Sequence, residues 1–389
     1  MKKIIALILA LTLVFSFAAC AAKADDAKTE QTTKDTAQET TTQETEQTEQ
    51  AEQVEQTEQP QEEETPELSG SLVICSSATD NDLAAIQEGF NSIYPDVEIE
   101  FVTCSAGEGI ARVQAEAGNP TIDVFYSGLN QADGDKYADC FEQYVSTHDA
   151  EVPEQYQSNN GFYNYDHLSS VVFCVNTELE AELGLDIKGY ADLLDPKLEG
   201  KIIFSDPTSS SAAWNNLCNI FSVYGIDTQE SWDYIDALLE NMVVVEKSSV
   251  CFNSVSDGEY VVGLTYEDGA IKLNQSAAEL GTEAVTEVRY PSNGTSASAF
   301  GVAIVKGAPH MAAAKAFVNW VTSAEGQSAM AEYMQGTLRF TNANYTSPEN
   351  AWLKASSDIT WVTRDVPTLT AQKADLLAKW NEHLAAVQG

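Results

Sequence analysis

The stretch SLVICSSATDNDLAAIQEGFNSIYPDVEIEFVTC, residues 71–104, decides the fold class. It begins with SLVICSS, a short continuous apolar run that is typical of a strand buried on both faces. DNDLAAIQEGFNSIYP follows with apolar residues at helical spacing and ends at Pro95, which cannot continue a helix. VEIEFVTC then alternates apolar and polar residues, as a second strand does. The stretch therefore predicts a strand–helix–strand unit.

The same alternation continues outward along the chain. EGIARVQAEAGNP, residues 108–120, predicts a helix, and TIDVFYSG, residues 121–128, predicts a third buried strand. A strand at 169–178 begins a second α/β unit, and further helices follow it. This order favours an α/β fold with a parallel sheet covered on both faces, in which ligands bind at the carboxyl ends of strands. Those ends carry Ser76, Ser77, Ser105, Tyr126 and Ser127.

Two other stretches carry candidate binding residues, and each has two interpretations. DPTSSSAAW, residues 206–214, places four hydroxyls where a helix begins. Unpaired N–H groups at a helix start favour Ser or Thr as caps, and the same groups bind anions. GFYNYDH, residues 161–167, combines aromatic side chains with a His. It fits stacking on a ligand, and it also fits a core beside a hinge.

The N-terminus has the features of an export signal. MKKIIALILALTLVFSFAAC combines two lysines, an apolar run and a small-residue site that ends in Cys20. The site predicts lipidation of Cys20, and an ordinary secretory signal is the alternative. Residues 21–69 consist mainly of Gln, Thr and Glu, which predicts a disordered acidic tether after the 1–20 signal peptide. We expect an exported protein on the extracellular face of the cytoplasmic membrane, attached to that membrane through the lipid alone.

Composition and motifs argue against several classes of protein. The formal net charge of −40 argues against a nucleic-acid partner, which requires a basic surface. The seven cysteines include no CxxC pair, so a zinc site is disfavoured. The pairing of Cys75, Cys104, Cys140, Cys174, Cys218 and Cys251 stays open, and buried free thiols are the alternative to disulfides. The chain has four His and lacks the HExxH, GxSxG and GxxxxGK[ST] motifs, and nothing in it argues for an enzyme. No cofactor is predicted.

Six pieces of the chain, taken in order, resemble the extracellular solute-binding proteins of ATP-driven importers, in the branch that includes ferric-ion and phosphonate binders. They are LVICSSATDNDLAAIQEGFNSIYPDVEIEF, IDVFYSG, LLDPKLEGKIIFSDPTSSSAAW, DGEYVVGLTYEDGA, YPSNGTSASAFGVAIVKGAPH and AAKAFVNWVTSAEGQ. The resemblance implies a type II periplasmic-binding-protein fold with two lobes, 70–171 plus 290–389 and 172–289. Two strands near 169–178 and 287–300 would cross between the lobes and form the hinge. It also implies a monomer that delivers a small solute or ion to membrane permease and ATPase subunits.

The resemblance also places the ligand between the lobes, with the segment 206–211 lining the cleft. The predicted binding residues are Ser76, Ser77, Tyr126, Ser127, Thr208, Ser209, Ser210, Ser211, Tyr266, Glu267, Asn293 and Thr295. Asn293 and Thr295 flank Gly294, which would allow close approach of the backbone to a ligand.

The identity of the solute has three interpretations. Ferric binders of this branch supply an adjacent Tyr pair, whereas this chain has Thr265 before Tyr266, so only one Tyr of the pair is present. If the ligand is iron, Tyr266, Glu267 and Tyr126 are the expected ligands, because Fe³⁺ prefers hard anionic oxygens. The hydroxyl clusters fit a small phosphorylated or phosphonate solute better. A polyamine, held by Glu267 and neighbouring acids, is the further alternative.

Overall fold

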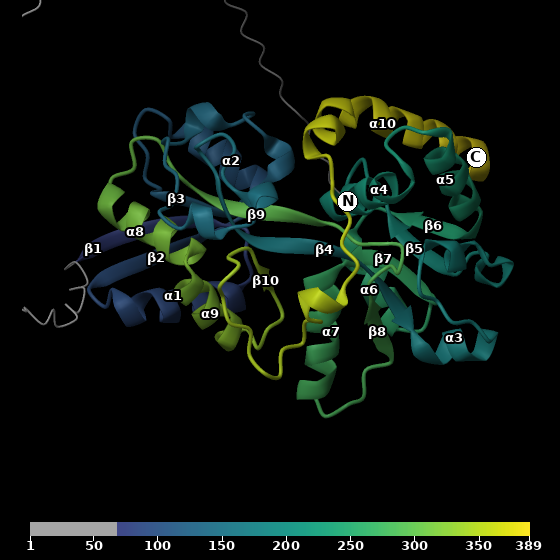
Figure 1. Ribbon diagram of the computed structural model, residues 1–389. Coiled ribbons are helices and arrows are strands. Elements are labelled where there is room, and N and C mark those ends of the chain that lie inside the picture. Colours follow the sequence, from purple (N-terminus) through teal and green to yellow (C-terminus); the bar gives the residue numbers. More distant parts are fainter. Residues whose placement is uncertain (1–67) are drawn as a thin grey trace, which may run out of the picture. The chain divides into compact units, whose positions relative to one another are not determined.

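The computed structural model describes residues 68–389, so the predicted signal with Cys20, and nearly all of the predicted tether, lie outside the described residues. The strands are paired in the order β2-β1-β3-β9-β4-β7-β5-β6, and β8 and β10 also pair with β4 (Figure 1). We call the side with β2, β1 and β3 the first lobe and the side with β7, β5 and β6 the second lobe. Among residues 68–389, no helix has the length and apolar character that a membrane span needs.

The first lobe begins with the predicted strand–helix–strand unit, which is confirmed. β1 (Gly70–Ser76) and β2 (Val97–Thr103) pair in parallel, and α1 (Asp80–Ile93) connects them. α2 (Ala106–Ala115) then leads to β3 (Val124–Asn130), which pairs in parallel with β1. α1 buries Leu83, Ile86 and Phe90 in a core that also includes Phe317 and Trp320. Full burial of a side chain of this size contributes ~1.5–3 kcal/mol, so this face holds the helix on the sheet.

Two strands cross between the lobes. β4 (Asn164–Asn176) pairs with β9 (Ala297–Ile304) through its first half and with β7 through its second half. β4 and β9 overlap the predicted crossings near 169–178 and 287–300. Both are antiparallel to the neighbours with which they pair, so the sheet is mixed. This corrects the parallel sheet that the sequence predicts. The reason is that a chain that passes from one lobe to the other and later returns must reverse its direction.

The second lobe is the second α/β unit. β5 pairs in parallel with β6 and with β7, and β8 pairs with β4. Its elements are α3 (Thr177–Leu183), β5 (Ile202–Ser205), α4 (Ser211–Tyr224), α5 (Gln229–Asn241), β6 (Met242–Val245), α6 (Ser248–Ser256), β7 (Val262–Tyr266), α7 (Glu267–Glu279) and β8 (Thr286–Arg289).

The chain then returns to the first lobe and ends on the second. α8 (Met311–Thr322), α9 (Ala324–Tyr333) and β10 (Arg339–Phe340) belong to the first lobe by their packing. α10 (Val366–Gln388) instead packs Leu369, Leu376 and Trp380 into the core of the second lobe. The sequence assigns 290–389 to the first lobe, whereas α10 packs on the second lobe. Its apolar side chains are buried against α5 and β5, from which they are far apart in sequence.

Candidate functional site

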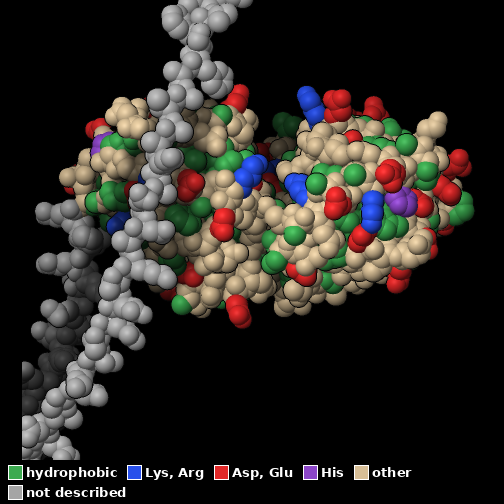
Figure 2. Space-filling model, turned by 90° about the horizontal axis from the view of Figure 1, so that it is seen from above, with side chains coloured by type: hydrophobic (Ala, Val, Ile, Leu, Met, Phe, Trp, Pro, Cys, Tyr) green, Lys and Arg blue, Asp and Glu red, His purple; other side chains and the backbone are tan. Residues whose placement is uncertain are grey.

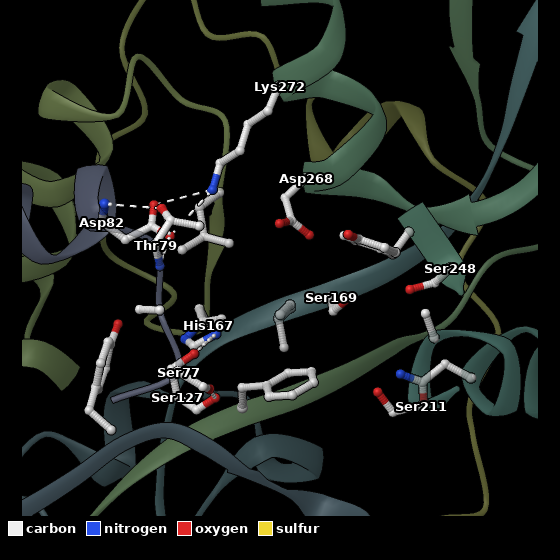
Figure 3. A pocket seen from close by; sticks show the side chains of 18 residues that line it. Ser77, Thr79, Asp82, Ser127, His167, Ser169, Ser211, Ser248, Asp268 and Lys272 are labelled. Atoms are coloured by element: carbon white, nitrogen blue, oxygen red, sulfur yellow. Dashed lines mark hydrogen bonds and ion pairs between the residues drawn. The ribbon is translucent and has the colours of Figure 1, made fainter. Parts of the chain in front are cut away.

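A cavity of about 350 Å³ lies between the lobes at the carboxyl ends of β1 and β7. Figure 3 shows that side chains from both lobes point into it, with Asp82 and Lys272 at one end and Ser211 and Ser248 toward another. It is lined by Ser77, Ala78, Thr79, Asp82, Tyr126, Ser127, His167, Leu168, Ser169, Ser211, Ala212, Asn215, Ser248, Tyr266, Asp268, Lys272, Phe300 and Leu338.

The first-lobe wall is built where β1 ends and where the pairing of β3 is interrupted. Ser77 donates from its hydroxyl to the carbonyl oxygen of Ser127 at 2.6 Å, which ties the end of β1 to this point of β3. Ser127 has a positive φ of 60° at the point where the pairing of β3 with β9 shifts register. A left-handed backbone at a residue other than Gly costs free energy and is concentrated at functional sites. Ser127 lines the cavity, where its Oγ lies 3.5 Å from His167 Nε2.

A buried carboxylate holds two side chains of the first-lobe wall in place. Asp166 is fully buried, and its Oδ2 lies 2.9 Å from His167 Nδ1 and accepts from the Tyr126 hydroxyl at 2.9 Å. Burial opposes protonation of His167, but the charge and hydrogen bond of Asp166 outweigh it and raise the pKa of His167. Burial and Asp166 also hold the pKa of Tyr126 well above its ordinary value. The first-lobe wall therefore presents a neutral phenol from Tyr126 and an imidazole from His167 that favours its charged form.

Three helices of the second lobe begin at the cavity. α4 contributes Ser211 and Ala212, α6 contributes Ser248, and α7 contributes Asp268. The N–H groups of Ser211 and Ala212 have no hydrogen-bond partner in the part of the chain that the structure describes. α6 and α7 begin without a capping side chain. Helix starts carry partial positive charge and free donors, so the starts of α4 and α6 favour a negatively charged group, whereas the first turn of α7 already carries Glu267 and Asp268.

A cation lies directly behind this wall. Arg364 donates from Nη1 to Oδ1 of the cavity residue Asn215 at 2.8 Å, and also to the hydroxyls of Ser296 and Ser298. Arg364 has no ion-pair partner among residues 68–389, whereas Arg112, Arg289 and Arg339 each have at least one. Burial lowers the pKa of Arg364 from its ordinary value, but an arginine stays protonated in proteins. Its charge is therefore balanced by neutral oxygens alone.

The other end of the cavity contains acids and a lysine. Lys272 of α7 reaches across to Asp82 of α1, with 3.2 Å between Nζ and Oδ1, so this ion pair joins the lobes (Figure 3). Asp268 lies one helical turn before Lys272. Burial raises the pKa of Asp268, an effect that the charge of Lys272 partly offsets.

Five of the predicted binding residues line the cavity: Ser77, Tyr126, Ser127, Ser211 and Tyr266. Ser211 follows the predicted start of the helix, where Ser210 is the N-cap and its hydroxyl accepts from Ala213 N–H at 3.2 Å. Both interpretations of the 206–214 stretch therefore have a residue that fits them.

The other predicted residues lie outside the cavity lining, and their polar groups have protein partners. Ser76 is buried and accepts from Ala78 N–H, and Thr208 donates to Asp206. Ser209 donates to the carbonyl oxygen of Glu246, Asn293 accepts from Tyr190 N–H, and Thr295 donates to the carbonyl oxygen of Val171.

Glu267 is the most informative of the residues that do not line the cavity. It is buried and forms an ion pair with Arg339, with 2.7 Å between Nη2 and Oε1. Tyr290 donates its hydroxyl to the same carboxylate. The side chain thus faces away from the predicted ligand, and the neighbouring Asp268 occupies the cavity instead.

Sequence reasoning missed several residues that line the cavity. Thr79 and Asp82 form a capping box at the start of α1, a pattern visible in the sequence directly after the first strand. Asp268 and Lys272 are spaced by four residues and so share one face of α7, as do Ser211 and Asn215 on α4. His167 belongs to the stretch 161–167, for which the sequence offers ligand stacking as one interpretation. In that stretch Tyr163 and Tyr165 are core residues and His167 lines the cavity, stacked on Phe300.

Comparison with known proteins places this geometry in a family. The model of the family "Bacterial extracellular solute-binding protein" matches residues 76–328. An uncharacterized protein of Haemophilus influenzae is 29% identical over 322 residues, which covers 80% of this chain and 90% of that protein.

Solved structures are similar over nearly their whole length. The periplasmic binding protein AfuA from Actinobacillus pleuropneumoniae, with exogenous fructose-6-phosphate bound, is 26% identical with a TM-score of 0.66, covering 82% of this chain and 99% of that one. Iron-bound HitA from Pseudomonas aeruginosa is 19% identical with a TM-score of 0.63, covering 79% and 98%, a likeness that shows the fold alone. The chain therefore belongs to the bacterial extracellular solute-binding protein family and has the two-lobed type II fold of the proteins that serve ATP-driven importers.

Proposed function

We propose that this protein captures a small phosphorylated solute, of the sugar phosphate class, in the cavity between its lobes. The observation that carries the proposal is the meeting of helix starts with an unpaired arginine. Ser211, the free N–H groups of α4 and the start of α6 face the cavity, and Arg364 lies behind Asn215. A phosphoryl group is the ligand chemistry that such donors bind best, because its oxygens accept several charge-assisted hydrogen bonds at once.

The opposite end of the cavity suits a polyhydroxylated body. Asp82 and Asp268 supply carboxylate acceptors, and Ser77 and Ser127 supply hydroxyls. Sugar hydroxyls can donate to the carboxylates and to the oxygen of Ser77, whose own proton is donated to the Ser127 carbonyl, and they can accept from the Ser127 hydroxyl. AfuA, the 26% identical structure, holds fructose-6-phosphate, which supports the same class of ligand here.

The two rival ligands have weaker support from the same residues. A ferric site built on phenolates would have to deprotonate Tyr126, which donates to Asp166, and Tyr266, whose pKa burial raises to about 12. Glu267, the third iron ligand predicted from the sequence, is paired with Arg339. A polyamine would meet Asp82 and Asp268, but Asp82 is already paired with Lys272.

Calorimetry on the purified protein tests this proposal. The panel is fructose 6-phosphate, glucose 6-phosphate, inorganic phosphate, fructose, ferric citrate and spermidine. We expect the sugar phosphates to bind and Ser211→Ala to weaken them by roughly ten- to a hundred-fold, because a hydrogen bond to a charged group contributes ~1.5–3 kcal/mol. Ser209→Ala is the matched control, because the Ser209 hydroxyl donates to the carbonyl oxygen of Glu246 and the residue lies outside the cavity lining. The Ser209→Ala variant should bind the sugar phosphates as the wild type does.

Each rival has its own outcome in this panel. Binding of ferric citrate alone, abolished by Tyr266→Phe, would replace the proposal by iron uptake. Binding of spermidine alone, abolished by Asp268→Asn, would replace it by polyamine uptake. Equal losses in Ser211→Ala and Ser209→Ala would show that the α4 start contributes to stability and not to recognition.

Family membership implies a ligand and the permease and ATPase subunits of an importer as partners. We propose in addition that the protein is a monomer that transports rather than catalyses, and that Cys20, outside the described residues, carries a lipid anchor. Release of a Cys20→Ala variant into the medium would support the anchor, and retention on the membrane would contradict it.

A further inference from the structure

Two cysteines meet at the carboxyl ends of β1 and β2, beside the cavity wall. The sulfurs of Cys75 and Cys104 lie 3.1 Å apart, and the residues are separated by 29 positions. They form the only sulfur–sulfur contact at hydrogen-bonding distance that is found within residues 68–389. We propose that Cys75 and Cys104 form a disulfide in the exported protein.

The surrounding structure already holds both thiols in place. Cys75 lies at the end of β1 and is fully buried in the core that contains Phe125, and Cys104 directly follows β2. Cys104 N–H donates to the carbonyl oxygen of Ser76 at 3.0 Å, which fixes the backbone on both sides. A Cβ on Gly109 would lie 3.0 Å from Cys104 Sγ, so α2 packs closely over this sulfur. Closing the bond requires the two sulfurs to approach by about 1 Å, because a disulfide is ~2.05 Å long.

The difference in accessibility sets the order of the chemistry. Cys104 is partly exposed, whereas Cys75 is buried and burial raises the pKa of its thiol to about 12. The thiolate of Cys104 attacks a disulfide oxidant, RS–SR, and forms a Cys104–S–S–R bond while RS⁻ leaves. Cys75 loses its proton as its sulfur attacks Cys104 Sγ and expels the second RS⁻. Two thiols are thereby oxidised and one RS–SR is reduced to two RSH.

The disulfide would act on the wall of the cavity. Residues 77–79, which line the cavity, directly follow the Ser76 carbonyl that Cys104 holds. A bond between Cys75 and Cys104 ties the start of that segment to β2 as well as to β3, where Ser77 already binds Ser127. Members of this family are extracellular proteins. Disulfides persist in such oxidising surroundings, in contrast to the reducing cytosol.

Peptide mapping under non-reducing conditions tests the proposal. The chain is equilibrated with oxidised and reduced glutathione, alkylated and digested, without any ligand. We expect a peptide that links Cys75 to Cys104, a loss of two free thiols, and slower hydrogen exchange in residues 76–79 of the oxidised protein. Cys104→Ser should lose the linked peptide and keep the Cys75 thiol, while Cys140→Ser, at another partly exposed cysteine, should behave as the wild type.

Two results would overturn the inference. One is glutathione attached to Cys104 without closure onto Cys75, or a linked peptide between other cysteines. The other is the expected linkage with unchanged exchange at residues 76–79, which would remove the effect on the cavity wall. Because no solute enters the experiment, neither result depends on the proposed ligand.

Discussion

Asp268 lines the cavity at a cost to the stability of the folded protein, because its carboxyl is buried. Burial raises the pKa of its carboxyl above the 3.8 of an exposed aspartate, so the folded state binds the proton more tightly than the unfolded state. Below pH 3.8 the carboxyl is protonated in both the folded and the unfolded state, and the tighter proton binding of the folded state contributes its full amount to stability. As the pH rises through the raised pKa, the folded protein must bury a charge, and this contribution is lost.

We therefore expect Asp268→Asn to melt at a higher temperature than the wild type at neutral pH. The difference should shrink as the pH falls toward 3.8, and thermal melts across that range would measure it. Asp227→Asn is the contrasting control, because Lys379 and Trp232 lower the pKa of that carboxyl and its loss should destabilise at neutral pH. Equal melting temperatures of Asp268→Asn and the wild type at every pH would contradict the prediction.

The start of α4 carries both a helix cap and a residue of the proposed phosphate site. Ser210 caps the helix by accepting from Ala213 N–H, and Ser211, one residue later, faces the cavity. Ser210→Ala should lower the free energy of unfolding by ~0.5–2 kcal/mol, the usual contribution of an N-cap hydroxyl. Urea denaturation would measure it, with Ser211→Ala as the comparison that should stay close to the wild type. A larger loss in Ser211→Ala than in Ser210→Ala would reverse the two roles.

At the scale of the whole molecule, contacts across the cavity set the balance between closed and open arrangements of the two lobes. Lys272 and Asp82 form an ion pair between α7 and α1, in which the lysine side chain is 30% exposed. Such a pair contributes up to ~1 kcal/mol, which is about a five-fold change in the balance between closed and open forms. Lys272→Met should therefore raise the radius of gyration of the ligand-free protein in small-angle scattering, and fructose 6-phosphate should lower it in the wild type.

A lysine whose ion pair stays within one lobe is the matched control for this measurement. Lys379 pairs with Asp227, and both α10 and the α4–α5 connection belong to the second lobe by packing. Lys379→Met should leave the radius unchanged. The same radius in Lys272→Met and Lys379→Met would show that the Lys272–Asp82 pair does not hold the lobes together. In Figure 2 the Asp and Glu side chains are spread over the visible face.

The sequence by itself determined the elements and their order. The 71–104 stretch gave a correct strand, helix and strand because hydrophobic periodicity and capping residues act over a few neighbouring positions. The same local signals located the start of α4 and the end of β1, which Ser77 follows. The predicted end of the third strand at Tyr126 and Ser127 is instead a register shift within β3, which continues to Asn130, and both side chains line the cavity there.

Only the tertiary structure decided which polar residues face the cavity and which form internal pairs. Glu267 and Asp268 are adjacent acids at the start of α7, and nothing local distinguishes them. Arg339, 72 positions away, pairs with Glu267 and turns it from the cavity, so Asp268 lines it instead. Arg364 likewise reaches Asn215 across 149 positions, and α10 packs on the second lobe. A buried charge is stable only with its partners, and chain segments distant in sequence supply those partners after folding.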